Sequence, residues 1–208
     1  MLRATTTAVT AVALGRRCLP VPSLEAAVAL ARRLEGAVLG GELGGHMPYA
    51  FEVTNSPVAL SQREDVERPL ILLSSSGTRM LSAADDAADE VYVGSLRNVR
   101  ATADAAAAGD RRVIVVGAAT RGEFREEDQL CCAWIAARIL DAGYAPADAR
   151  TTELVERWRD EPADALTVSK SVAYLRNTDQ LRDLDFVLEH VDDLELAFRM
   201  RAGEVVRA

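Results

Sequence analysis

Short apolar runs alternate along the chain with longer segments in which apolar residues keep helical spacing. The runs have strand length, are apolar on both faces, and cover residues 69–73, 90–94 and 112–117. Such strands are typical of a covered, mostly parallel sheet. Helical spacing extends over 5–15, 24–34, 79–88, 96–108, 126–142, 164–175 and 181–191. The alternation predicts a layered α/β fold in which helices cover a mostly parallel sheet.

The end of the chain predicts a C-terminal hairpin. Residues 194–200 and 204–206 flank Ala202 and Gly203, a pair suited to a tight turn. With 208 residues and no linker or repeat, the sequence predicts a single α/β domain over 1–208.

The start of the chain suggests a further strand. The segment 5–15 reads as a helix, and no strand precedes it after Met1. Because a helix of an α/β fold normally follows a strand, we expect the reading frame to continue upstream with a short β-like run that ends in Asp.

Composition and net charge exclude some classes of binding partner. The chain has 24 Lys and Arg against 32 Asp and Glu, a net charge of −8, which argues against nucleic acid. Its longest early apolar stretch, 8–14, is too short to span a bilayer. Cys18, Cys131 and Cys132 are odd in number and lack metal-ligand spacing, which favours a reducing, cytoplasmic setting. We expect no membrane partner; the oligomeric state is open, with a homodimer as one arrangement.

Three loops follow the predicted strands and share a composition. Residues 74–79, 94–98 and 117–122 each combine Gly, Ser or Thr, and Arg. Ligands of open α/β sheets bind at the carboxyl ends of strands, where glycine, free N–H groups and helix dipoles favour an anion. Each loop alone also fits an ordinary turn or cap. Together, the loops predict a site for a phosphorylated or otherwise multiply charged acid.

Two groups of carboxylates are candidate metal ligands. Glu42 lies among four glycines in 40–46, which fits a lid or metal-holding loop and equally a loop with a solvated Glu42. Glu127 and Asp128 begin the helix 126–142, where acids complement the helix dipole. The alternative is that one of them turns inward as an Mg²⁺ ligand or general acid/base.

Taken in order, several short motifs resemble the 2-phosphosulfolactate phosphatase family of coenzyme M biosynthesis. They span nearly the whole chain, at residues 2–7, 41–45, 55–57, 76–79, 94–98, 120–124, 127–131 and 181–186. The resemblance implies an α/β phosphatase that uses Mg²⁺ to hydrolyse (2R)-2-phospho-3-sulfolactate, or a related phosphorylated hydroxy acid, to the alcohol and phosphate.

The resemblance also implies roles for individual residues. It gives a catalytic role to Arg3, Glu42, Arg121 and Asp128, substrate contacts to Thr5, Asn55, Ser56, Thr78, Arg79, Ser95 and Asn98, and Mg²⁺ ligation to Glu42, Glu127 and Asp128. We expect the arginines to hold anionic groups by paired donors and the metal to neutralise phosphate oxygens.

The sequence departs from the family pattern at two places. Leu43 stands where the family more often has Arg, and the strand with an acidic residue before residue 2 is missing. These departures leave a second hypothesis open: a non-catalytic anion-binding or metabolite-binding protein that kept the arginine loops but lost catalytic acids.

Overall fold

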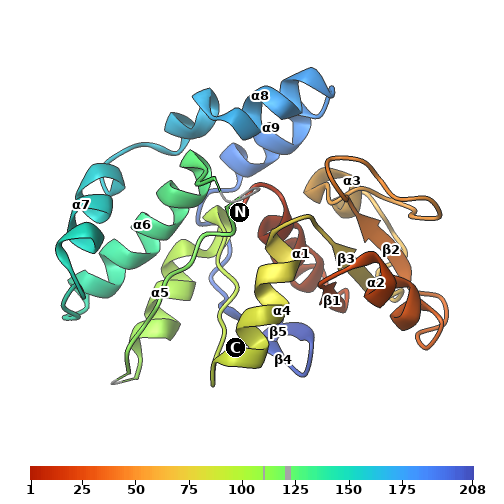
Figure 1. Cartoon of the computed structure of the whole chain (residues 1–208), viewed down its shortest axis with the longest axis horizontal. Helices are drawn as coiled ribbons and strands as arrows, with labels where there is room; N and C mark the ends of the chain where they lie inside the picture. Colours follow the sequence, from red (N-terminus) through yellow and green to blue (C-terminus); the bar gives the residue numbers. More distant parts are fainter. Residues whose placement is uncertain (110, 120–122) are drawn as a thin grey trace. The chain divides into compact units, whose positions relative to one another are not determined.

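The structure, a computed structural model, describes residues 1–109, 111–119 and 123–208, and the chain divides into two compact units. The sheet unit comprises Arg3–Val93 and Phe198–Ala208. The helical unit comprises Met1–Leu2 and Gly94–Ala197. Figure 1 labels the helices and strands of both units.

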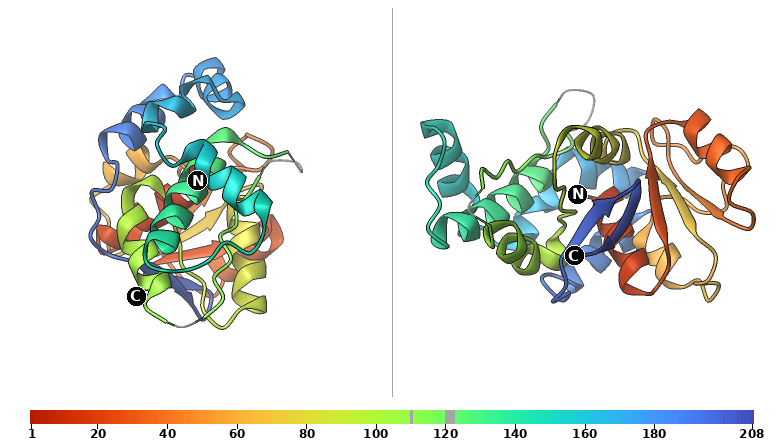
Figure 2. Two further views of the ribbon diagram at one scale, coloured as in Figure 1. Left: turned by 90° about the vertical axis from the view of Figure 1, so that its left-hand side faces the viewer. Right: turned by 90° about the horizontal axis from the view of Figure 1, so that it is seen from below.

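The sheet unit is built on a five-stranded sheet in the order β2-β3-β1-β5-β4. Its strands are β1 (Cys18–Val21), β2 (Val38–Gly41), β3 (Leu70–Leu73), β4 (Phe198–Arg201) and β5 (Glu204–Arg207). Strands β1 and β2 pair in parallel with β3, whereas β5 runs antiparallel to β1 and β4. The blue β4–β5 hairpin is seen best in the right-hand view of Figure 2. The predicted mostly parallel sheet and C-terminal hairpin are confirmed.

Helices pack on this sheet, as the layered prediction requires. They are α1 (Ala4–Ala13), α2 (Leu24–Ala31), α3 (Pro57–Ser61) and α4 (Gly77–Ala87). Ala27 of α2 joins Ile71 and Leu73 of β3 in one core cluster. Helix α1 is buried from Ala4 to Ala11 although it carries four threonines in that stretch. Buried threonine hydroxyls normally have hydrogen-bond partners, so the contacts of these threonines bear on the role of α1.

The helical unit has its own apolar core. Its elements are the 3₁₀ turns η1 (Leu96–Asn98) and η2 (Ala163–Val168) and the helices α5 (Val99–Ala107), α6 (Glu126–Asp141), α7 (Ala149–Trp158), α8 (Lys170–Asn177) and α9 (Leu181–Glu189). Helix α6 packs against α5 and α7 and contributes Leu130 and Ile135 to the core. Among the described residues, no helix of either unit is long and apolar enough to cross a membrane.

Two of the predicted strands are wrong. Residues 90–94 form an isolated antiparallel bridge with β4, Tyr92 to Arg199, with backbone hydrogen bonds of 2.8 Å from Val93 to Phe198 and from Met200 to Val91. Residues 112–117 pair with no strand in the part of the chain that the structure describes. The segment still alternates, because Val113 and Val115 pack on the core while Ile114 and Val116 are 71% and 57% exposed. The apolar run was therefore assigned correctly as extended but wrongly as a sheet member.

The helix predicted over 164–175 is also divided. Its first part is the 3₁₀ turn η2, and its second part belongs to α8, which begins after Ser169. The Ser169 hydroxyl accepts from the backbone N–H of Val172 over 3.3 Å. Serine competes with the helical backbone for its hydrogen bonds and so favours an N-cap over a helix interior.

Candidate active site

The carboxyl ends of β2 and β3 lie side by side because the strands are parallel neighbours. Glu42 follows β2 and Ser74 follows β3, and the N–H of Glu42 donates to the carbonyl of Leu73 over 3.0 Å. Gly41 permits this approach, since its φ is 147° and a Cβ there would lie 2.1 Å from the Leu73 oxygen. Such an edge is where open α/β sheets bind ligands.

Glu42 joins the two loops at this edge. Its Oε1 accepts from the backbone N–H of Ser75, and its Oε2 accepts from the Ser75 hydroxyl, each over 2.8 Å. Oε2 also accepts from the N–H of Gly45 over 2.8 Å. Glu42 is therefore held by protein donors and is not the solvated carboxylate that composition equally allowed. Ser75 was not singled out from the sequence, although it lies in the predicted anion loop.

The N-terminus of α1 lacks a side-chain cap. Arg3 occupies the N-cap position and its carbonyl accepts from the N–H of Thr7 over 2.9 Å, but no side chain caps the helix and no acid lies in its first turn. In contrast, Ser23 caps α2 and Ser56 caps α3. Uncapped N–H groups and the positive end of the dipole favour an anion. The Ser56 hydroxyl, predicted to bind substrate, acts as the α3 cap.

Two buried polar side chains beside this N-terminus have no partner. Thr5 is 7% exposed and Asn55 is 4% exposed, yet Thr5 Oγ1 and Asn55 Oδ1 form no hydrogen bond within the described chain. The Thr7 hydroxyl donates to the carbonyl of Asn55 over 2.7 Å, which places Asn55 against α1. Helical side chains tilt toward the N-terminus, so Thr5 leans over the first turn. We call this turn of α1, with Thr5 and Asn55, the anion cradle.

The first turn of α4 packs closely on that of α1. A Cβ on Gly77 would lie 2.7 Å from the Cβ of Ala4. Thr78 is fully buried and satisfied, because its N–H donates to Ser74 Oγ over 3.0 Å and its Oγ1 accepts from Ser74 N–H over 2.8 Å. Arg79, the next residue, is exposed and forms no ion pair with any described residue. Of this pair, Arg79 is the side chain that can reach a ligand.

Ser95 and Asn98 belong to the helical unit and form a capping box in η1. Asn98 Oδ1 accepts from both the N–H and the hydroxyl of Ser95 over 2.9 Å. Ser95 Oγ accepts from the N–H of Arg97 over 3.3 Å. Both side chains are fully buried, and these contacts give them a task in shaping the turn. Their predicted contact with substrate stays a prediction.

Glu127 and Asp128 turn inward at the start of α6. They are 2% and 6% exposed, which is unlike acids that merely complement a helix dipole at the surface. Asp128 Oδ1 accepts from the amino group of Met1 over 2.6 Å, and Oδ2 accepts from the N–H of Ala119 over 3.1 Å. Glu127 Oε2 is buried without a hydrogen-bond partner.

The surroundings of these carboxylates stabilise positive charge. Desolvation by burial would lower the pKa of the Met1 ammonium, but the charge and hydrogen bond of Asp128, with a further contribution from Glu127, raise that pKa above its ordinary value. Of these two carboxylates, Glu127 has the oxygen without a hydrogen-bond partner, Oε2. Within residues 1–109, 111–119 and 123–208, no three His, Cys, Asp or Glu side chains gather as a metal-binding group. Arg121 lies outside the described residues.

The environment of Cys131 and Cys132, near Asp128, disfavours the thiolate form. Burial is the main cause that raises the pKa of the Cys131 thiol far above its ordinary value. Burial and the charge of Asp128 raise the pKa of Cys132 to about 11. Cys131 is 3% exposed within the apolar core, in agreement with its predicted packing role.

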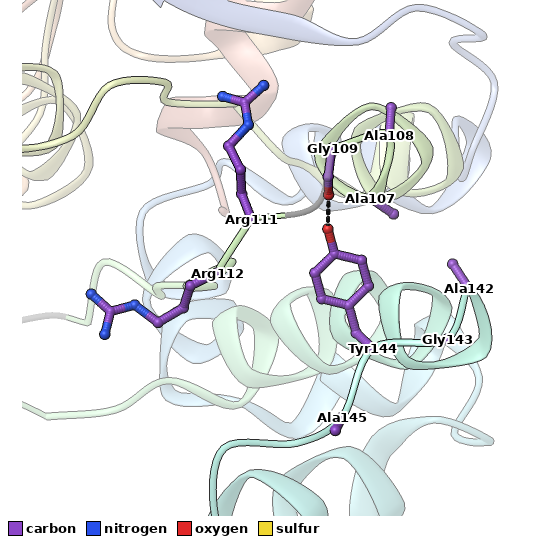
Figure 3. Close-up of a pocket in the computed structure, with 9 residues that line it drawn as sticks. All are labelled: Ala107, Ala108, Gly109, Arg111, Arg112, Ala142, Gly143, Tyr144 and Ala145. Carbon is purple, nitrogen blue, oxygen red and sulfur yellow. Dashed lines mark hydrogen bonds between the residues drawn. The ribbon is translucent and has the colours of Figure 1, made fainter.

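A pocket of about 670 Å³ lies in the helical unit, and none of the predicted site residues lines it. It is lined by Ala107, Ala108, Gly109, Arg111, Arg112, Ala142, Gly143, Tyr144 and Ala145. The Tyr144 hydroxyl donates to the carbonyl of Gly109 and so joins the chain beyond α5 to that beyond α6 (Figure 3). Both arginine side chains point away from Tyr144 (Figure 3), so no group of donors converges in the pocket.

Comparison with known proteins gives one consistent result. A family model described as 2-phosphosulpholactate phosphatase matches residues 1–197. A Clostridium perfringens (strain 13 / Type A) protein named "Probable 2-phosphosulfolactate phosphatase" is 30% identical over 99% of this chain and 85% of its own length. The "2-phosphosulfolactate phosphatase" of Methanothermobacter thermautotrophicus is 32% identical over 91% of this chain and 79% of its own. A Clostridium acetobutylicum relative is 32% identical over 68% of this chain, and the match covers 60% of that relative's own length. The chain belongs to the 2-phosphosulpholactate phosphatase family.

Proposed function

We propose that this protein is an Mg²⁺-dependent phosphatase that hydrolyses 2-phosphosulfolactate or a closely related phosphorylated hydroxy acid. The names of its relatives support the reaction and the substrate class. The observation that carries the proposal is the anion cradle, where Thr5 and Asn55 are buried without partners at an uncapped helix N-terminus. Buried polar groups normally have partners, and an anionic ligand would supply an acceptor for the Thr5 hydroxyl.

The cradle can hold a phosphate without a full counter-charge. The N–H groups of the first turn of α1 and the Thr5 hydroxyl are donors, and a half-turn of the Asn55 amide presents its NH₂ group. Arg79, exposed on α4, adds a planar cation suited to paired contacts with phosphate or sulfonate oxygens. Donors fixed before the reaction also stabilise negative charge that develops on phosphate oxygens during hydrolysis.

Glu127 is the side chain that best fits a role as Mg²⁺ ligand. Its Oε2 is buried without a hydrogen-bond partner, and carboxylate oxygen is the ligand type that Mg²⁺ prefers. Both oxygens of Asp128 already accept hydrogen bonds, from the Met1 amino group and the N–H of Ala119. Both oxygens of Glu42 are likewise engaged, by Ser75 and Gly45. A bound Mg²⁺ would supply neutralisation of phosphate oxygens and orientation of a nucleophile.

A non-catalytic anion-binding protein is the second candidate. It is favoured by the contacts of Asp128, because both carboxylate oxygens already have partners within the chain and neither is free for a metal ion. The free cysteines, Cys18, Cys131 and Cys132, fit the cytoplasmic setting proposed for either candidate.

Phosphate release separates the two candidates. We expect the protein to release phosphate from 2-phosphosulfolactate with Mg²⁺ and not with a chelator. Inorganic phosphate should raise the Tm in either case, because a ligand at 100 times its Kd stabilises the folded state by about 2.7 kcal/mol. Glu127→Gln should weaken the Mg²⁺ dependence of release while leaving the phosphate-induced rise of Tm unchanged. A rise of Tm without any release of phosphate would favour the binding protein. If phosphate neither raises the Tm nor is released, the anion cradle is rejected.

A further inference from the structure

We propose that Glu42 and Ser75 form a latch that positions the first turn of α4 against the anion cradle, and that Glu42 is a positioning residue and not a metal ligand. The inference rests on the proposed function, since it assigns the parts of the same site. Its evidence is a closed set of hydrogen bonds within the sheet unit.

The Glu42 carboxylate accepts three hydrogen bonds from neighbouring donors, so that both of its oxygens are engaged. Two of its contacts are with the N–H and hydroxyl of Ser75, and the third is with the N–H of Gly45, each over 2.8 Å. The Ser75 hydroxyl in turn accepts from the N–H of Gly44 over 2.7 Å. Ser75 therefore contacts the start of the loop after β2 at Glu42 and its tip at Gly44, through its backbone and its side chain. Hydrogen bonds to a carboxylate are stronger than those between neutral groups.

The loop after β2 is a rigid turn. Leu43 and His46 form a bridge with two backbone hydrogen bonds of 2.9 and 3.2 Å. Gly44 and Gly45 occupy its tip with φ of 62° and 89°, which is the conformation that a two-residue hairpin turn requires. A turn with this geometry offers a fixed support against which the loop after β3 can be held.

The loop after β3 transmits this support to the ligand site. Ser75 lies two residues before Gly77, which meets Ala4 at the start of α1. Arg79 lies on the same turn of α4. A shift of Ser75 therefore displaces the start of α4 relative to the cradle and moves Arg79 with it. Misplacement of a binding group by about 1 Å can cost on the order of a hundredfold in rate.

The latch is tested by a double-mutant cycle. We expect Glu42→Gln and Ser75→Ala each to raise KM about tenfold or more, and the double variant to be no worse than the poorer single variant, because residues that act through one another are not additive. The Mg²⁺ concentration that gives half-maximal activity should not change. Ser75→Thr, which keeps the hydroxyl, should retain most of the activity.

A second readout and a matched control complete the test. The rise of Tm with inorganic phosphate should shrink in Glu42→Gln and in Ser75→Ala. Ser82→Ala is the control, because Ser82 lies on α4 and its hydroxyl donates only within the helix, to the carbonyl of Thr78 over 3.0 Å. It should leave both KM and the phosphate effect unchanged.

Several results would overturn the latch. One is a Glu42→Gln variant with a large change in Mg²⁺ requirement beside an unaffected Ser75→Ala. Additive losses in the double variant are another. Should Glu42→Gln fail to fold, Ser75→Ala decides alone: a normal KM and a normal phosphate effect reject the proposal. If the wild type shows no phosphatase activity, the proposed function fails, and the phosphate effect in the same variants still judges the latch.

Discussion

Thr5 and Thr102 share one feature at two different places. Each is a buried threonine on a helix whose hydroxyl has no partner within the described chain, Thr5 in the first turn of α1 and Thr102 further along α5. Replacement of an unsatisfied buried hydroxyl by a methyl group of the same shape is nearly neutral or stabilising. The pair therefore allows the effect on ligand binding to be separated from the effect on stability.

We expect Thr5→Val to keep or raise the Tm but to lower kcat/KM about tenfold, the loss of one hydrogen bond to a charged group. Thr102→Val should also keep the Tm and leave kcat/KM unchanged. Thermal unfolding and steady-state phosphate release measure the two effects. Equal activity of both variants would remove Thr5 from the cradle.

The residue scale also shows where sequence reasoning reached its limit. The motifs singled out Glu42, Asn55 and Glu127, whose roles stay predictions. They did not reveal that both oxygens of Glu42 are engaged or that Glu127 is buried, because acids beside glycine or in a first helical turn are usually at the surface. Only the side-chain contacts distinguish a positioning carboxylate from a ligand.

At the scale of elements, an ion network fixes the chain before β3. Arg16 is 2% exposed and donates to Asp65 over 2.8 Å and to the carbonyl of Arg68 over 2.7 Å. Asp65 also accepts from Arg63, and Arg68 pairs with Glu52 over 2.6 Å. The hydrogen bond from Arg63 is the main cause that lowers the pKa of Asp65 well below its usual range, although desolvation opposes it.

This network predicts a loss of stability in acid. Because the pKa of Asp65 is lower in the folded state, its contribution is fully present above the unfolded-state value of about 4 and is lost as the pH falls below it. Asp65→Asn should destabilise the protein by about 2 kcal/mol at pH 7, since Arg16 loses a charged partner in a buried setting. The difference from wild type should shrink toward pH 3 in denaturant titrations. A constant difference across that range would contradict the assignment.

The β2–β3 junction depends on one glycine. Gly41→Ala should destabilise the fold by about 3 kcal/mol or more, because the new Cβ would meet the backbone of Leu73 at 2.1 Å. Gly36→Ala is a matched control, since Gly36 has a φ of 77° but open space around it, and should cost about 1 kcal/mol. Urea unfolding compares the two. Similar losses would show that conformation, not contact, sets the cost.

Helices and strands were predicted where their own residues carry a clear apolar pattern. The helix over 126–142 and the strand over 69–73 were found because both have continuous apolar patterns. The strand predicted over 112–117 does not form, since a run of apolar residues indicates burial and says nothing of a neighbour in a sheet. Strands β1 and β2 were missed because each spans only four residues and contains Pro or Gly.

At the scale of the whole molecule, the order of weak motifs was more informative than any one of them. The family match spans residues 1–197, and the motifs that suggested it are distributed over nearly that length. The division into units was not visible in the sequence, because no linker marks it and Phe198–Ala208 joins the sheet unit by pairing with β1. The prediction of a single domain stays a prediction.

The extended segment 112–117 has a practical consequence for work with the protein. Ile114 and Val116 are exposed, and the segment forms no ladder with the described part of the chain. Backbone of this kind, with apolar side chains beside it, can serve as a template for intermolecular β-pairing, which is one route to aggregation. Precipitation at high concentration would therefore start at this segment, and charged gatekeepers at 114 and 116 are the first choice for a crystallisable variant.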